Sequence, residues 1–390
     1  MVLEQQKKNL INLRLENSLG LHMRVLVIAQ NDKLAINVIR CLRMAGMTAC
    51  LMGADSRSVA RFSRYCAIWI KADGGIFNAP FTGAVGQIDD CCEQQGIDLV
   101  MGADMPAVRM LSSIHARLTR VKTFPLASPE QLQMLHNKWL FSQFLREQHL
   151  PVPATVLVKS EDELTRIPLE YPLIVKPVEM EGGAGVKKLN SPTDARAHLL
   201  RDNAAHRLPL LFQEFIPGID VGLSVLANQG EIVAWTIQKW LSTGALEFVA
   251  DEQVLALGKK ITAASGFHGV AHFDMRRDER DGAVKILECN PRFWASLRES
   301  MWNGTNFVEQ GIRLAQDRLL DPMINRRITY VFPARALVSS IKGNLFGLRQ
   351  FSIASLRDAW QTCSDPLVLA CQIKQKWSKH HRLSRDRAHH

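Results

Sequence analysis

Residues 284–292 read V-K-I-L-E-C-N-P-R, and this stretch decides the fold. An apolar run ends here in three polar side chains at alternate positions, Glu288, Asn290 and Arg292. Side chains two apart on a strand point to the same face. A strand that continues past Pro291 therefore directs a carboxylate, an amide and a guanidinium toward one place.

The preceding apolar run, G-V-A-H-F-D-M at 269–275, adds a second carboxylate, Asp274. The midpoint between Asp274 and Glu288 is Asp281, beside Gly282, so the two runs are expected to form a hairpin. An odd-membered loop centred there places the carboxylates opposite each other, whereas a two-residue loop shifts the register and separates them. Opposed carboxylates with the Asn290 oxygen suit Mg²⁺. The alternative is a solvated hairpin end held by ion pairs.

Length and composition predict a large protein without a membrane span. The 390 residues, 47% of them hydrophobic, suffice for two or three domains. No apolar stretch approaches about 18 residues, and the first ten residues lack the apolar block of a signal peptide. Eight scattered cysteines without a C-x-x-C pair indicate reduced thiols. We therefore expect a cytoplasmic protein.

Positive charge is concentrated in the C-terminal tail. Lys and Arg outnumber Asp and Glu by 48 to 38, and residues 374–390 read K-Q-K-W-S-K-H-H-R-L-S-R-D-R-A-H-H. One interpretation is a solvated terminus, and the other is a weak contact with a membrane surface or an acidic partner. No nucleic-acid partner is expected, because no binding module accompanies the tail.

The N-terminal third predicts a parallel sheet. R-V-L-V-I-A-Q at 24–30 reads as a buried strand, a helical pattern follows, and T-A-C-L-M at 48–52 starts a second strand. The first turn, Q-N-D-K-L-A, has no glycine, which disfavours a dinucleotide cofactor.

From residue 154 short strands dominate. One of them ends in Lys176, directly before the glycine-rich loop M-E-G-G-A-G-V-K-K at 180–188. Its backbone N–H groups can reach phosphates, although a plain glycine turn is the alternative.

Five motifs in this order resemble the ATP-grasp superfamily. They are N-K-W at 137–139, Y-P-L-I-V-K-P at 171–177, G-G-A-G-V at 182–186, L-F-Q-E-F-I-P-G-I-D at 211–220, and F-D-M with I-L-E-C-N-P-R within 273–292. The sequence pattern is similar to that of the carbamoyl-phosphate-synthase-like group of carboxylate–amine ligases. The motifs S-R-Y at 63–65 and D-P at 365–366 agree with this resemblance.

The resemblance implies an α/β fold with a Rossmann-like pre-ATP-grasp domain followed by an ATP-grasp fold. The implied parts are an N-terminal extension (1–20), the pre-ATP-grasp domain (21–122), the ATP-grasp domain (123–320) and a helical C-terminal extension with the basic tail (321–390). Two α+β lobes would clamp ATP, with a mobile lid lobe at about 155–212.

The resemblance also implies a role for each matched residue. The ATP contacts would be Lys138 and Lys176 on phosphates, Gly182, Gly183 and Gly185 in the lid loop, Glu214 and Ile216 at the adenine edge, and Asp220 on the ribose. The ligands of Mg²⁺, or alternatively Mn²⁺, would be Asp274, Glu288 and Asn290, and the catalytic cation would be Arg292. Lys239 is a weaker candidate for a further basic contact.

The implied reaction joins a small-molecule carboxylate to an amine through an acyl phosphate, with release of ADP. Alternatives are a carboxyphosphate or thiol acceptor chemistry, or an ATP-binding scaffold without turnover. His272 is a candidate base or a packed histidine. Trp294, Trp302 and Arg298 are candidates for an acceptor pocket, with core packing or a surface arginine as alternatives. The substrates and the oligomeric state stay open.

Overall fold

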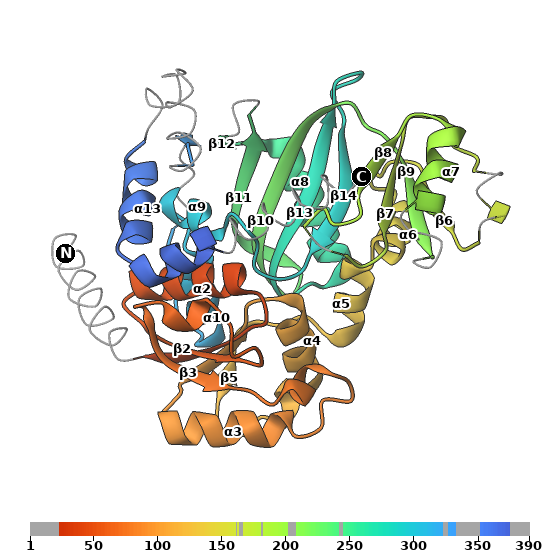
Figure 1. Cartoon of the computed structure of the whole chain (residues 1–390). Coiled ribbons are helices and arrows are strands. Elements are labelled where there is room, and N and C mark those ends of the chain that lie inside the picture. Colours follow the sequence, from red (N-terminus) through yellow and green to blue (C-terminus); the bar gives the residue numbers. More distant parts are fainter. Residues whose placement is uncertain are drawn as a thin grey trace. The chain divides into compact units, whose positions relative to one another are not determined.

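The computed structural model describes residues 23–160, 162–163, 167–180, 182–201, 208–241, 245–322, 327–332 and 352–374 (Figure 1). These residues form two compact units. The first contains residues up to 126 and from 292 onward, together with Ala245, and the second lies within 127–291. The predicted extension 1–20 and the tail beyond 374 fall outside the described residues, and the predicted domain limits stay predictions.

A five-stranded parallel sheet forms the centre of the first unit, in the order β3-β2-β1-β4-β5. The strands are β1 (Arg24–Ile28), β2 (Thr48–Gly53), β3 (Cys66–Lys71), β4 (Leu99–Gly102) and β5 (Lys122–Thr123). The connecting helices are α2 (Asp32–Met44), α3 (Ala84–Gln95) and α4 (Met105–Ile114), with short 3-10 turns η1 (Ala60–Phe62), η2 (Gly74–Phe77) and η3 (His115–Arg117). Central strand β1 is wholly buried from Val25 to Ile28. The predicted parallel β/α domain is confirmed.

The described C-terminal residues are part of this first unit. They form α9 (Leu297–Trp302), α10 (Phe307–Ala315), β15 (Ile328–Tyr330) and α13 (Ile353–Cys363), and residues 366–374 are helical. The side-chain amide of Asn37 on α2 donates to Ala295 O at 3.0 Å, and that of Asn306 donates to Cys41 O at 3.0 Å. These contacts fix both ends of the 295–306 segment to α2.

The second unit holds two antiparallel sheets, which correspond to the two predicted α+β lobes. One sheet has the order β6-β9-β7-β8. Its strands are β6 (Thr155–Val158), β7 (Leu173–Pro177), β8 (Lys187–Leu189) and β9 (Leu210–Glu214), and α7 (Pro192–Arg201) follows β8. The other sheet runs β14-β13-β10-β11-β12. It comprises β10 (Gly218–Asn228), β11 (Glu231–Trp240), β12 (Leu246–Val249), β13 (Gly269–Asp278) and β14 (Val284–Asn290), with helices α5 (Pro129–His136), α6 (Lys138–Glu147) and α8 (Glu252–Ser265) in the same unit.

The β13–β14 hairpin has the register on which the proposed metal site depends. Asp274 pairs directly with Glu288. The loop is not odd-membered, however: Asp278 N donates to Ala283 O at 2.8 Å, which closes a four-residue loop at 279–282. That loop alone would pair Asp274 with Leu287, but a bulge at Leu287 shifts the ladder by one residue. The bulge, not the loop, therefore brings the carboxylates together.

No helix in the part of the chain that the structure describes is long and apolar enough to cross a membrane.

Candidate functional site

The three predicted metal ligands lie together on the β13–β14 hairpin. Asn290 Nδ2 donates to Asp274 Oδ2 at 2.9 Å and lies 3.4 Å from Glu288 Oε1. His272 pairs with Asn290 across the ladder, and its Nε2 lies 3.4 Å from Asp274 Oδ1. Its other ring nitrogen lies 2.9 Å from Ser224 Oγ, so His272 is a packed, hydrogen-bonded histidine that orients Asp274. One face of the hairpin thus gathers two carboxylates and an amide.

This donor set fits Mg²⁺. Hard divalent cations take carboxylate and amide oxygens, and Mg²⁺ keeps waters or phosphate oxygens in its other positions. Two carboxylates and one amide then suffice as the protein ligands of Mg²⁺. Within the described ranges no group of three or more His, Cys, Asp or Glu side chains is arranged to hold a metal ion. The amide of Asn290 directs its nitrogen at both carboxylates, so a half-turn of that amide would direct its oxygen there instead. Mn²⁺ accepts the same oxygen ligands.

Lys176 is a buried cation beside the carboxylates. It lies on β7 with an exposed fraction of 4%. Its Nζ donates to Gln213 Oε1 at 3.0 Å and to Leu287 O at 3.2 Å. Burial lowers the pKa of Lys176 to about 8, while the negative charge of Glu288 acts in the opposite direction. The bulge at Leu287 therefore has a second role, because its carbonyl is one of the acceptors that hold this ammonium.

Lys138 begins helix α6 and is 7% exposed. Its Nζ donates to Met180 O at 2.6 Å and lies 3.5 Å from Glu288 Oε2. Its backbone N–H donates to Val178 O at 3.0 Å. The same residue thus holds the chain that enters the glycine-rich loop and places a second ammonium beside Glu288.

The glycine-rich loop joins β7 to β8 through left-handed backbone. Gly182, Gly183 and Gly185 have φ angles of +65°, +75° and +73°. A Cβ on Gly182 or Gly183 would meet no atom within 4 Å, whereas a Cβ on Gly185 would lie 2.8 Å from Pro177 Cγ. Gly185 is therefore needed both for its conformation and for close packing against the end of β7. The other two glycines are needed for the turn alone.

The predicted adenine and ribose contacts lie at the start of β10 and the end of β9. Glu214 Oε1 accepts a hydrogen bond from Arg280 Nη2 at 2.8 Å. The carbonyl of buried Ile216 accepts from Arg276 Nε at 2.6 Å, and Arg276 also forms an ion pair with Asp220. Both carboxylates are thus already neutralised by an arginine.

Sequence reasoning missed Arg276, Arg280 and Gln213. Arg276 lies two residues after Asp274, so the alternation of side chains along a strand could have placed it on the same face. Gln213 is a polar residue inside the apolar run P-L-L-F-Q; it is buried, and its Nε2 donates to Thr155 Oγ1 at 2.9 Å. Arg280 lies in the hairpin loop and carries no comparable signal.

The remaining candidates have the following contacts. Arg292 belongs to the first unit, is 7% exposed, and donates to Phe293 O at 2.6 Å. Trp294 is buried against Phe307, with ring centroids 4.9 Å apart. Trp302 and Arg298 both contact Asp358, at 3.1 Å and 2.8 Å, so Arg298 is not a surface arginine. Lys239 lies 3.2 Å from Glu247 on the neighbouring strand.

Comparisons with known proteins identify the fold. The D-aspartate ligase of Enterococcus faecium is 25% identical over 227 residues, which are 51% of this chain and 54% of that protein. The chain thus spans about half the length of that relative. Among solved structures, the L-amino acid ligase of Bacillus licheniformis has a TM-score of 0.60 at 19% identity, covering 80% of both chains. The N5-carboxyaminoimidazole synthetase of Staphylococcus aureus has a TM-score of 0.61 at 13% identity, covering 83% of this chain and 86% of that chain. Both share the fold, and the family model described as the ATP-grasp domain matches residues 135–296. This chain therefore contains an ATP-grasp domain.

Proposed function

We propose that the protein is an ATP-dependent, ADP-forming ligase that activates a small-molecule carboxylate and joins it to an amine. The observation that carries this proposal is the pairing of Asp274 with Glu288 beside two buried ammonium groups, those of Lys138 and Lys176. Buried cations beside a hard oxygen set suit a polyphosphate with its metal. The names of the D-aspartate ligase and the L-amino acid ligase favour an amino acid among the substrates.

Each part of the nucleotide has a proposed partner. Lys138 and Lys176 bind phosphate oxygens, and the backbone N–H groups of the glycine-rich loop cover them. The adenine edge meets Glu214 and the backbone of Ile216, and the ribose hydroxyls meet Asp220. The ion pairs of Glu214 and Asp220 with arginines reduce the repulsion between these carboxylates and the polyphosphate.

The reaction has two steps. A substrate carboxylate oxygen attacks the γ-phosphorus of ATP, the bond to the bridging oxygen breaks, and ADP leaves with the electron pair. The amine then attacks the carbonyl carbon of the acyl phosphate, phosphate leaves, and the amine nitrogen loses a proton. Positive charge from Lys138, Lys176 and the proposed catalytic residue Arg292 balances the transferred phosphoryl group.

Asp274, Glu288 and Asn290 would hold Mg²⁺, which when bound supplies charge neutralisation of the polyphosphate. His272 keeps Asp274 in place through its contact with Ser224. No side-chain nucleophile is required.

The test is a screen of amino acids and small carboxylates, in pairs with amines, for stimulated ADP release. Product mass should equal that of the two substrates minus water, and Glu288→Ala should abolish both signals. ADP release that depends on bicarbonate, without an amide product, would assign carboxyphosphate chemistry instead. ATP binding without stimulation by any pair would favour a silent scaffold.

A further inference from the structure

Helix α13 is inverted relative to an ordinary surface helix, because its buried face is polar and its outer face is apolar. The inward side chains are Ser355, Asp358 and Gln361, with Ala354 as the one apolar member, and Asp365 lies two residues after the end of the helix. In a typical surface helix the apolar stripe faces the core. Two features of α13 therefore need an explanation: what binds its polar inner face, and what contacts its apolar outer face.

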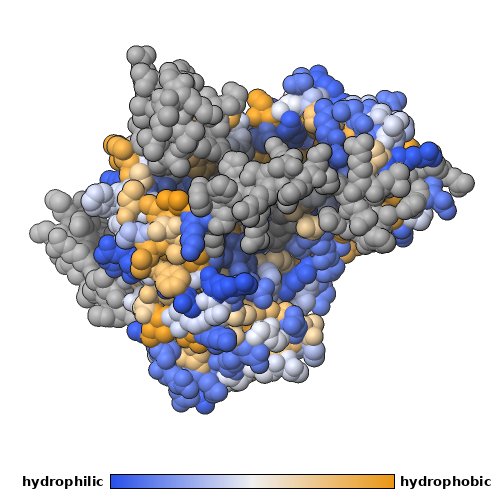
Figure 2. Space-filling view, viewed as in Figure 1, coloured by the Kyte–Doolittle hydropathy of each residue, from blue (hydrophilic) through white to orange (hydrophobic). Residues whose placement is uncertain are grey.

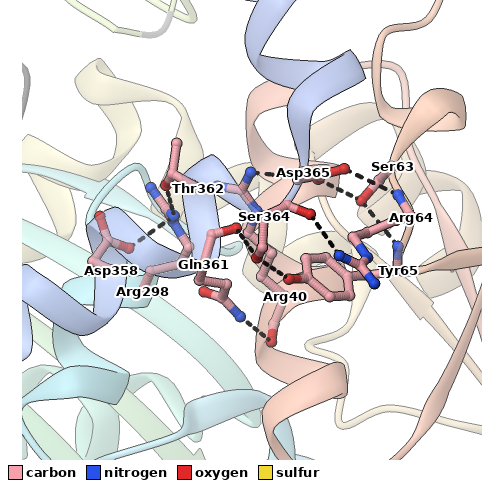
Figure 3. A network of polar contacts seen from close by, with 10 residues as sticks. All are labelled: Arg40, Ser63, Arg64, Tyr65, Arg298, Asp358, Gln361, Thr362, Ser364 and Asp365. Carbon is pink, nitrogen blue, oxygen red and sulfur yellow. Dashed lines mark hydrogen bonds and ion pairs between the residues drawn. The ribbon is translucent and has the colours of Figure 1, made fainter.

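A buried polar network holds the inner face (Figure 3). Asp365 accepts hydrogen bonds from Ser63 Oγ at 2.7 Å and from Arg64 N at 3.0 Å, and it lies 3.4 Å from Arg40 Nη2. Asp358 binds Arg298 at 2.8 Å. Figure 3 shows how these residues join α13 to α2 and to the loop at 63–65. Since burial of unpaired polar groups is costly, this network fixes the orientation of the helix.

The opposite face consequently points outward, and it is apolar (Figure 2). Five of the thirteen exposed large apolar side chains among the described residues lie between 352 and 374. They are Ile353 (71%), Leu356 (56%), Trp360 (78%), Leu367 (62%) and Ile373 (59%). The first three are spaced three and four apart, which aligns them along one side of α13. A contiguous apolar face of this kind marks an interaction surface.

The charge of this face points to its partner. Every exposed residue between 352 and 374 is apolar, small or cationic. The two acids of the segment, Asp358 and Asp365, are buried in the network, whereas Arg357 and Lys374 are exposed. The chain then continues through residues 374–390, which contain six Lys or Arg and one Asp. Among the described residues 352–374, apolar and cationic groups therefore occur together with no exposed acid.

We propose that the outer face of α13 and of helix 366–374 docks onto an anionic phospholipid surface. Tryptophan and aliphatic side chains enter the interfacial region of a bilayer, and adjacent Lys and Arg attract anionic headgroups. A second copy of the chain fits less well, because a two-fold interface would place the same cationic patch against itself. The proposal does not depend on the ligase activity.

Co-sedimentation of the full chain with vesicles tests the proposal. Binding to phosphatidylcholine vesicles that contain phosphatidylglycerol should be strong, it should weaken with salt, and it should be low for phosphatidylcholine alone. The double substitution Leu356→Gln with Trp360→Gln should weaken binding tenfold or more (order of magnitude from the apolar area removed). Arg357→Gln should weaken it about fivefold.

Leu319→Gln is the matched control, because Leu319 is 88% exposed in the same unit but outside this face. It should leave binding unchanged, and all variants should keep the melting temperature of the wild type. The proposal is overturned if the full chain does not bind anionic vesicles, or if the double variant binds as well as the wild type. A dimer that the double variant dissociates would assign the face to a second copy.

Discussion

Replacement of Lys176 by methionine tests whether the proposed phosphate site places a positive charge in the protein interior. The Lys176 ammonium is 4% exposed and has Gln213 Oε1 and Leu287 O as acceptors. Burial lowers the pKa of Lys176 from its ordinary value of 10.5 to about 8. One pKa unit corresponds to about 1.4 kcal/mol. The charged form of Lys176 therefore destabilises the fold by about 3 kcal/mol.

The sign of the pH dependence follows from proton binding. Below pH 8 both the folded and the unfolded chain carry the proton on Lys176, so the destabilisation is fully present. Between pH 8 and 10.5 the unfolded chain keeps the proton and the folded chain releases it, so the contribution of Lys176 to stability rises with pH. Lys176→Met removes this group. The free energy of unfolding of the wild type relative to the variant should rise by about 3 kcal/mol across this window.

At pH 7 two effects oppose each other in the variant. Loss of the buried charge stabilises it, and the unpaired Gln213 and Leu287 acceptors destabilise it by about 1–3 kcal/mol. The change in stability at pH 7 alone is therefore a poor test, and the pH dependence is the informative quantity. Urea unfolding at a series of pH values measures it. Lys187→Met on the neighbouring strand is the control, because Lys187 is exposed. A wild-type-to-variant difference that stays constant from pH 7 to 10.5 would refute the reasoning.

Three further predictions concern the metal site, the network of α13 and the glycine-rich loop. Glu288→Gln should lower substrate-stimulated ADP release by about 100-fold without loss of fold, as measured by kinetics and circular dichroism. Asp365→Asn should lower the free energy of unfolding by about 3 kcal/mol, because it leaves buried Arg40 without its ion-pair partner; Asp55→Asn, in an exposed pair, should leave thermal stability unchanged. Gly185→Ala should raise the KM for ATP more than Gly183→Ala does, since both glycines have positive φ but only the new Cβ at 185 meets another residue. Equal KM values would contradict the packing role of Gly185.

The sequence predicted the elements of the hairpin but not its register. The midpoint between Asp274 and Glu288, at Asp281, located the turn, and alternation placed Glu288 and Asn290 on one face. A β-bulge leaves no local pattern of its own at Leu287, since its effect depends on how two strands pair. The sequence left an odd-membered and a two-residue loop open, and the structure has neither: a four-residue loop together with the bulge pairs Asp274 with Glu288.

The sequence alone gave no physical reason for the motifs S-R-Y at 63–65 and D-P at 365–366. In the structure Asp365 accepts hydrogen bonds from Ser63 and from the backbone of Arg64. Such a contact joins residues about 300 apart, so no local periodicity could predict it. Buried polar networks of this kind become visible only when the tertiary packing is known.

The candidate site combines features that stability alone would not favour. Lys176 is held where its charge is costly, and Lys138 adds a second, similarly buried ammonium beside Glu288. Two carboxylates face each other across the same hairpin, with an amide N–H group between them. Each arrangement is unfavourable in isolation, but a polyphosphate with its cation would compensate both, because its oxygens meet the ammonium groups and its metal meets the carboxylates. In the proposed function the charges would therefore be in place before the nucleotide binds, as electrostatic preorganisation requires. That is the physical reason for proposing that this hairpin serves a nucleotide rather than the stability of the fold.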